Sequence, residues 1–359
     1  MKEGEVLIIL IILLLAIVII FIMVWDSYKM DQRIANENTD NVIIENNSIN
    51  FNSLTLKQKI AQMIIVRGDG YDKDFVKLNI GGIHLDRQNS EESYKGCIEN
   101  YQSNSRIKLF VTTDLEGAWN PFRRLGEEYS FPTISEIETK EEAYNLGLRH
   151  GKILKELGFN LNFAPVSEFE DKVYGGRVFS GTKEEVKEKL EGYILGLQEN
   201  VLGTCKHYPG KGMIKNIHWS SDRQEISKED LGLFEDCIKN NISAIMVGHQ
   251  IVSGELDSDK KPSSVSKEII SNLPERVLII SDEINMLGLR MFYFFNKRKM
   301  YKDLINSGEN IILDFSVTPK SVYSLIEKLE KEVEKGEINE DTINKSVRKI
   351  LLAKGYFLD

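Results

Sequence analysis

Short apolar runs rich in β-branched residues recur along this chain between longer stretches of helical periodicity. Several of the runs are continuous rather than alternating, which is typical of parallel strands covered on both faces. Gly158 follows one of the helical stretches as a stop signal. The predicted strands are 63–66, 81–85, 108–114, 161–166, 203–209, 243–249, 276–282 and 310–315, and the predicted helices include 141–157, 183–199, 228–240 and 320–335.

Eight alternations of strand and helix within about 300 residues predict the α/β class and a single (β/α)8 TIM-type barrel. A doubly wound open sheet is the alternative. That fold would call for a glycine-rich phosphate loop early in the chain, and neither GxGxxG nor GxxxxGK[ST] occurs. In a barrel the active site lies at the carboxyl ends of the strands, which makes those ends the place to look for chemistry.

The first thirty residues have a different pattern. Residues 7–25 are apolar without a single charge, which is long enough to cross about 30 Å of hydrocarbon as a helix. A cleavable signal peptide would have a shorter apolar region and a small-x-small site, and a buried core helix is the other alternative. We predict an uncleaved transmembrane helix at 1–29, a polar, Asn-rich linker at 30–51 and one domain at 52–359.

Charge and composition narrow the class of protein. The chain is 42% hydrophobic and 28% charged, with a net charge of −9, as expected for a globular domain. The acidic balance argues against a nucleic-acid partner. Cys97, Cys205 and Cys237 show no CxxC or Cys/His ligand spacing, so we expect them to pack as small apolar residues, with neither a disulfide framework nor a zinc site.

Ionisable residues stand at the predicted strand ends: Asp114, Lys206, His207, His249 and Asp282. Because the carboxyl ends of parallel strands share one face of a barrel, we expect these side chains to form one site. A carboxylate fixed at a strand end suits a nucleophile or a metal ligand. Further carboxylates near the strand ends are few and no His-x-His spacing occurs, which disfavours a metal site.

A nucleophilic carboxylate needs a partner that gives and then accepts a proton. His218 lies in the long segment 210–222 after the fifth strand, and histidine does both near neutrality. With Asp282 it fits the retaining glycosidase scheme, in which a covalent glycosyl-enzyme intermediate forms. A solvated loop histidine is the alternative for His218.

From 54 to 355 the chain resembles the β-N-acetylhexosaminidases of glycoside hydrolase family 3. The motifs that carry the resemblance are IGGI (80–83), DLEG (114–117), GFNLNFAPV (158–166), GRVFS (176–180), KHYPGKG (206–212), AIMVGH (244–249) and SDEINMLG (281–288). The resemblance implies a single barrel that removes terminal N-acetylglucosamine, often from peptidoglycan fragments, without a metal or another cofactor.

Carried over by position, the resemblance makes Asp282 the nucleophile and His218 the general acid/base, with Asn216 at the place of the residue that orients the histidine. It also implies a set of side chains that hold the sugar's hydroxyl and N-acetyl groups: Asp114, Arg177, Lys206 and His207, with Arg124 or Arg123 in a further contact.

The chain departs from the family pattern at three places. Asn216 stands where an aspartate is usual, so we expect a less basic His218 and a more acidic pH optimum, or slower turnover. Lys211 replaces a second histidine in the strand-five motif. Ala118 and Trp119 stand where glycine and arginine are expected, and Trp119 could provide a stacking platform for a sugar.

The leading hypothesis is a membrane-anchored, monomeric, retaining exo-β-N-acetylglucosaminidase whose barrel faces the cell wall and takes a carbohydrate substrate. Lys2 opposes Lys29 and Arg33 across the span, so charge alone does not orient it, and the outward placement follows from the resemblance. A β-glycosidase of shifted specificity and a non-catalytic, glycan-binding descendant are the alternatives.

Overall fold

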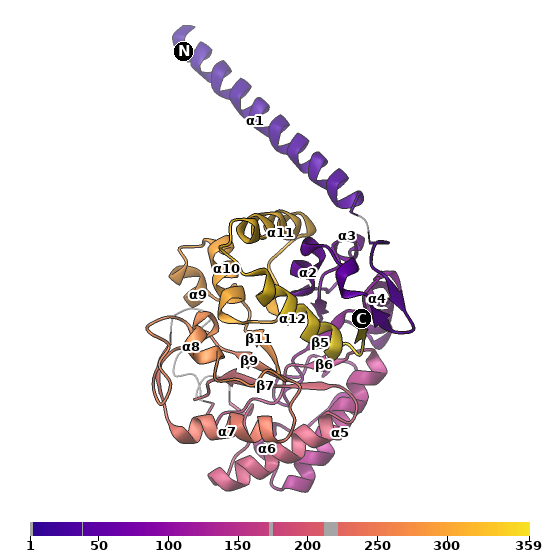
Figure 1. Cartoon of the computed structure of the whole chain (residues 1–359), viewed down its shortest axis with the longest axis vertical. Helices are drawn as coiled ribbons and strands as arrows, with labels where there is room; N and C mark the ends of the chain where they lie inside the picture. The colour runs from indigo at the N-terminus through magenta and orange to yellow at the C-terminus, as the bar shows by residue number, and fades with distance from the viewer. Residues whose placement is uncertain (1–2, 38, 172–174, 212–221) are drawn as a thin grey trace.

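The centre of the molecule is a parallel sheet that curls into a barrel (Figure 1). The computed structural model describes residues 3–37, 39–171, 175–211 and 222–359. The eight strands pair in the order β11-β9-β7-β6-β5-β4-β3-β12, and a parallel bridge between Ile280 and Ile311 joins the two ends of the sheet. All eight predicted strands and the barrel are confirmed. The strands are β3 (Ile64–Arg67), β4 (Gly82–His84), β5 (Phe110–Thr113), β6 (Leu161–Asn162), β7 (Leu202–Tyr208), β9 (Ala244–Val247), β11 (Leu278–Ser281) and β12 (Ile312–Asp314).

Helices surround the sheet, and many begin at a serine or threonine whose side chain caps the first turn, as in Thr139 before α5 and Thr182 before α6. Gly158 ends α5 with φ +99°, the left-handed conformation that favours glycine. The helices of the domain are α2 (Leu56–Gln62), α3 (Lys73–Lys77), α4 (Glu91–Asn104), α5 (Lys140–Leu157), α6 (Lys183–Leu197), α7 (Lys228–Lys239), α8 (Lys267–Ile270), α9 (Leu287–Phe292), α10 (Lys297–Ser307), α11 (Pro319–Glu334) and α12 (Glu340–Ala353). Short 3-10 turns lie at Phe51–Ser53, Glu127–Tyr129, Ile134–Glu136 and Ser263–Val265.

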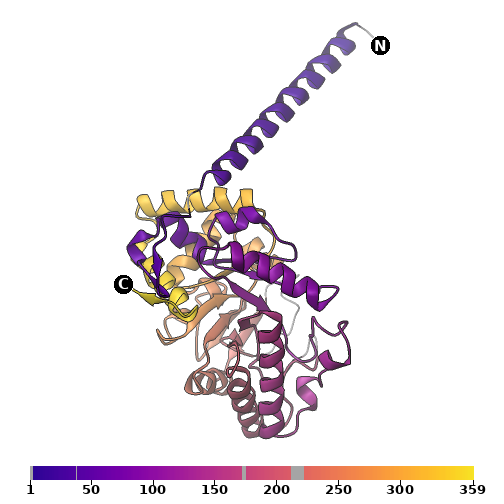
Figure 2. The ribbon, with the colours of Figure 1, turned by 90° about the vertical axis from the view of Figure 1, so that its right-hand side faces the viewer.

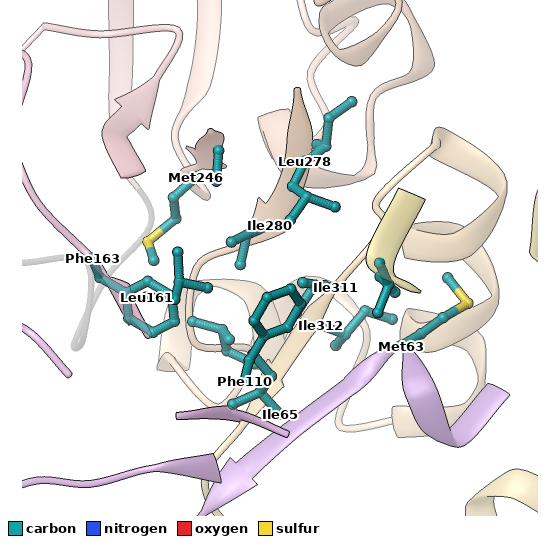
Figure 3. Close-up of a cluster of buried hydrophobic side chains, with 14 of the residues drawn as sticks. Met63, Ile65, Phe110, Leu161, Phe163, Met246, Leu278, Ile280, Ile311 and Ile312 are labelled. Carbon is teal, nitrogen blue, oxygen red and sulfur yellow. The ribbon is translucent and has the colours of Figure 1, made fainter. Parts of the chain in front are cut away.

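Side chains from opposite strands fill the barrel. Leu161, Met246 and Ile280 converge on its interior from β6, β9 and β11, and Phe110 and Ile312 meet them from β5 and β12 (Figure 3). All five are buried. The interior is therefore a packed core, and a ligand has to bind beyond the strand ends.

Two small sheets lie outside the barrel. The strands β1 (Ile44–Glu45) and β2 (Ser48–Ile49) form a hairpin, and β2 pairs with the last strand, β13 (Phe357–Leu358). The parallel pair β8 (Arg223–Ile226) and β10 (Ile251–Gly254) extends the segments after β7 and β9. Both chain ends of the domain are thus tied together by backbone pairing.

The N-terminal helix α1 (Glu3–Ala35) projects from the domain (Figures 1 and 2). From Leu10 to Trp25 its large apolar side chains are 46–68% exposed, and by length and composition Leu10–Ala35 qualifies as a membrane span. Among the described residues, its contacts with the domain lie in its last three turns. There Ile34 is buried, Lys320 pairs with Asp31 at 2.8 Å and Arg33 pairs with Glu327. Part of the segment expected as a linker is therefore helical.

The expectation for the cysteines was wrong for two of them. Cys205 in β7 and Cys237 in α7 form a disulfide, whereas Cys97 is free and half-buried. The residues are 32 positions apart in sequence. The barrel brings them together because α7 packs on the outer side of β7, a contact that Cys spacing alone does not reveal.

Candidate active site

A cavity of about 680 Å³ opens at the carboxyl ends of the barrel strands. Its volume is in the range of sites for small molecules, about 300–1,000 Å³. The polar side chains that line it lie in or after the barrel strands: Arg67, His84, Asp86, Thr113, Asp114, Glu116, Trp119, Arg177, Lys206, His207, Asp282, Glu283 and Ser316. The strand-end rule thus located the cavity correctly.

Lys206 is the centre of a charge network at the bottom of this cavity. Its Nζ lies 2.5 Å from Asp114 Oδ1 and also contacts Glu116. On its other side Glu116 receives two hydrogen bonds from Arg177, at 2.6 Å from Nε and 3.2 Å from a terminal nitrogen. The side chains of Lys206 and Glu116 are each only 4% exposed. Two cations and two carboxylates therefore compensate one another in a nearly dry site.

Burial opposes ionisation in this network, and the neighbouring charges overcome it. Burial by itself raises the pKa of Asp114, but Lys206 and His84 hold that pKa below its ordinary value. Burial likewise lowers the pKa of Lys206, whereas Asp114 and Glu116 raise it above its usual value. Since Asp114 and Lys206 each favour the charged form of the other, we infer that this pair stays ionised at neutral pH.

Lys206 and His207 are neighbours in β7, yet both line the cavity. Successive side chains of a regular strand point to opposite faces. The pairing of β7 with β9 shifts register between Lys206 and Tyr208, and this irregularity lets both residues face the site. His207 Nδ1 lies 2.9 Å from Glu168 Oε1, which is buried and fixes the ring.

Asp282 follows β11 directly and is 7% exposed. Its Oδ1 accepts a hydrogen bond of 2.7 Å from the backbone N–H of Glu283. Its Oδ2 is buried and has no hydrogen-bond partner among the described residues. A carboxylate that is held by one oxygen and leaves the other free beside a cavity is suited to attack a bound electrophile.

Aromatic rings form part of the cavity wall and rim. His84 stacks against Phe315 with centroids 4.5 Å apart, and burial lowers the pKa of His84, so that its ring is neutral near pH 7. Trp119 is 45% exposed at the rim, where the Arg87 guanidinium lies 5.1 Å from its ring. The rim thus offers one flat face for a sugar ring to stack on.

The structure brings five of the predicted site residues together in one cavity: Asp114, Arg177, Lys206, His207 and Asp282. Asn216 and His218 lie outside the described residues. Arg124 is exposed and is not among the residues that line the cavity. His249, which was predicted to belong to the same site, is not among the residues that line the cavity; its ring bonds to Ser264 Oγ at 2.7 Å and to the carbonyl of Glu283. Lys211 donates to the carbonyl of Glu225.

Three further residues belong to the site although the sequence did not mark them as ligands. Glu116 joins Lys206 to Arg177, Glu168 holds His207, and His84 lies 3.6 Å from Asp114. Glu168 comes two residues after the fourth predicted strand, so the strand-end rule applied a little further along the chain would have found it. His84 is the last residue of β4, so the same rule applied to the second predicted strand would have found it as well.

Residues 55–353 match the family model described as glycosyl hydrolase family 3 N terminal domain, and the chain belongs to this family. Among individual relatives, β-hexosaminidase LpqI of Mycobacterium bovis BCG is 25% identical over 328 residues, which cover 84% of this chain and 83% of the relative. β-Hexosaminidase A of Pseudoalteromonas piscicida is 24% identical over 299 residues, 70% of this chain and 48% of that protein.

Solved structures agree on the fold. The family 3 β-N-acetylglucosaminidase from Paenibacillus sp. FPU-7 superimposes with a TM-score of 0.75 at 23% identity, covering 84% of this chain and 62% of that one. A family 3 glycosyl hydrolase of Mycobacterium smegmatis gives 0.74 at 22% identity, covering 86% of this chain and 99% of that one. The chain is thus a glycoside hydrolase and a distant homologue of β-hexosaminidases.

Proposed function

We propose that this protein is a retaining exo-β-N-acetylglucosaminidase that removes terminal N-acetylglucosamine from cell-wall saccharides. The observation that carries the proposal is Asp282, a buried carboxylate beside the cavity with one oxygen held and the other unpartnered among the described residues. The relatives that bear the name β-hexosaminidase support the choice of sugar, and the family resemblance supports the cell wall.

In this mechanism Asp282 attacks the anomeric carbon while an acid protonates the leaving oxygen. The bond to the aglycone breaks as the bond to Asp282 forms, and water then releases the sugar with retained configuration. We assign the acid and base steps to His218 and the orientation of its ring to Asn216. Asp114, Arg177, Lys206 and His207 are assigned to the hydroxyl and N-acetyl groups, because charge-assisted hydrogen bonds fix a polar ligand in a defined orientation.

The assignment is tested with the full chain in detergent and a fluorogenic β-N-acetylglucosaminide. Asp282→Asn should lower kcat by on the order of 10³-fold or more, since the covalent route is lost. The matched control is Asp86→Asn, the same change at a residue on the cavity rim, which should stay within a few-fold of the parent. A fluorinated glycoside that slows the second step should add one sugar to the peptide containing Asp282.

The pH dependence tests the place of Asn216. The Asn216→Asp variant should be faster than the parent and should shift the pH optimum upward, because a carboxylate supports the protonated form of His218. An unchanged profile would contradict this role.

A parent chain that bound N-acetylglucosamine ligands without any turnover would instead favour the glycan-binding alternative, which the departures at Ala118, Trp119, Lys211 and Asn216 motivate. Turnover of another β-glycoside alone would favour a shifted specificity.

We further propose that α1 is an uncleaved membrane anchor with the barrel on the extracellular side. The exposed apolar surface from Leu10 to Trp25 is unfavourable in water and matches the hydrocarbon of a bilayer. The disulfide between Cys205 and Cys237 supports the orientation, since disulfides persist mainly in oxidising compartments. The full chain should float with vesicles after washing at high pH, and a chain lacking residues 1–29 should not.

A further inference from the structure

Four large apolar side chains are exposed within five residues at the end of α9 and just beyond it. They are Met291, Phe292, Phe294 and Phe295, with exposed fractions of 57%, 41%, 91% and 56%, and we call them the aromatic patch. Single exposed apolar residues are common on proteins, but a cluster of this size usually marks an interaction surface.

The backbone holds this patch in a defined shape. Phe294 and Phe295 have φ of +47° and +61°, in the left-handed region that bulky residues rarely adopt. Between the exposed residues Tyr293 is buried, and its hydroxyl bonds to Asp303 at 2.9 Å. The N–H of Phe295 donates to the carbonyl of Arg290 at 2.8 Å. The turn is thus anchored through Tyr293 while the neighbouring rings face outward.

The patch lies on the side of the barrel to which α1 is attached. The helix contacts α3 and α11, which follow β3 and β12, and the patch follows β11. The strands β11, β12 and β3 are consecutive in the closed barrel, so the patch, α11 and α3 belong to neighbouring sectors of the barrel wall. Figure 1 shows α9, α10 and α11 in the upper half of the domain, from which α1 rises.

The end of the apolar helix fixes the height of the membrane surface. Lys320, at the start of α11, bonds to Ser27 at 2.6 Å and to Asp31. Ser27 is two residues beyond Trp25, a rise of about 3 Å along a helix. The start of α11 is therefore placed at the level of the lipid headgroups when the helix spans a bilayer.

Basic residues flank the patch. Arg290 lies over the Phe295 ring at 4.8 Å, and Lys299 is exposed. Lys297 and Arg298 are partly compensated by Asp314 at 2.6 Å and Glu332 at 3.3 Å. Aromatic rings next to lysine and arginine are the combination that binds the interface of a bilayer with anionic headgroups.

We propose that the aromatic patch and its basic flank are a second membrane contact, which docks the barrel onto a bilayer surface with anionic headgroups. The inference rests on the proposed anchor and adds an orientation to it. Phe315 and Ser316 line the cavity, and at most about 18 Å of chain separates Phe315 from Lys320. Docking therefore holds the cavity mouth beside the membrane, where it takes glycans close to the lipid surface.

The test uses the full chain in vesicles of phosphatidylethanolamine and phosphatidylglycerol. Phe294→Cys carries an environment-sensitive fluorophore in a Cys97→Ala background, and Phe357→Cys is the matched control. Phe357 is 69% exposed in β13, and in Figure 2 the C-terminus lies on the left of the domain, whereas α1 leans to the upper right. Lipids with a nitroxide headgroup should quench the label at 294 at least about twofold more than the label at 357. Replacing phosphatidylglycerol by phosphatidylcholine should weaken the quenching.

Equal quenching at both positions in floating vesicles would overturn the docking proposal and leave the anchor intact. A chain that did not float would overturn the anchor, and the docking proposal with it. Self-quenching of the label at 294 without lipid quenching would assign the patch to contacts between copies, against the proposal. If Phe294→Cys fails to fold, Phe295→Cys replaces it. The double variant Phe294→Ser/Phe295→Ser should lose the contact, read by a label at Met291→Cys, and keep its turnover of a small soluble glycoside.

Discussion

Both ends of the barrel bury ionisable groups, but only at the carboxyl end are the described groups paired with opposite charges. At the carboxyl end Lys206 contacts Asp114 and Glu116, and Arg177 completes the network. At the amino end Glu309, just before β12, is fully buried, and neither carboxyl oxygen has a partner among the described residues. Lys354 bonds there to the uncharged amide oxygen of buried Gln62 at 2.8 Å.

The paired charges at the carboxyl end and the unpaired charges at the amino end differ in whether they stay ionised. Paired charges remain ionised when buried and are available to a polar ligand, whereas single charges are driven toward their neutral forms. Burial raises the pKa of Glu309 well above its ordinary value and lowers the pKa of Lys354 well below its own. We infer that the carboxyl end serves binding, while the amino end contributes only to stability.

The largest effect is expected from breaking the network at the carboxyl end. Lys206→Met leaves Asp114 and Glu116 as close carboxylates in a dry site, which should cost about 3–5 kcal/mol of unfolding free energy. It should also lower kcat/KM by on the order of 100-fold, since a lost charged hydrogen bond is worth about 1.5–3 kcal/mol. Urea unfolding and kinetics measure both. Lys206→Arg should recover part of the stability, and a Met variant as stable as the parent would contradict the network.

At the amino end, Glu309→Gln should change the pH dependence of stability. The folded chain keeps a proton on Glu309 that the unfolded chain releases, because its folded pKa is raised above 4.5. This stability is fully present below pH 4.5 and is lost as the pH rises through the folded pKa, at up to about 1.4 kcal/mol per pH unit. The unfolding free energy of the variant should therefore increase relative to that of the parent as the pH rises. Urea midpoints from pH 5 to 8 test this, with the exposed Glu334→Gln as control.

For Lys354→Met, the difference in unfolding free energy from the parent should change with pH in the opposite direction to that of Glu309→Gln, and by less. The pKa of folded Lys354 is lowered below 10.5, so its contribution is present above pH 10.5 and is lost as pH falls through the folded pKa. The unfolding free energy of the variant should then increase relative to that of the parent as the pH falls. The residue is only partly buried, which reduces the effect relative to Glu309. Parallel stability curves for Lys354→Met, the parent and the exposed control Lys331→Met would refute a neutral Lys354.

The smallest effect is expected at the rim of the carboxyl end. Trp119→Ala removes a stacking surface worth about 0.5–1.5 kcal/mol, so KM should rise by about 2–12-fold with kcat nearly unchanged. Trp119→Phe should restore most of the affinity, because the flat ring remains. A fall in kcat at constant KM would instead show that Trp119 acts on the transition state.

The local sequence pattern was enough to predict the barrel strands and the site at their carboxyl ends. Short apolar runs gave all eight strands, and several of these runs are continuous because a strand buried on both faces needs apolar residues on both. The carboxyl ends of those strands then placed Asp114, Lys206, His207 and Asp282 in one site, since parallel strands share an end. Arg177 came from the resemblance alone, as it lies outside any strand.

The sequence by itself determined the barrel, the apolar N-terminal helix and the strand ends that carry chemistry, since each depends on the periodicity of neighbouring residues. Only the tertiary structure decided which side chains pair with one another. Lys206 meets Asp114 across 92 positions, Cys205 meets Cys237 across 32, and Glu309 has no partner among the described residues. The register shift in β7 that turns both Lys206 and His207 to the cavity is of the same kind. Such contacts depend on distances in space, which no local pattern specifies.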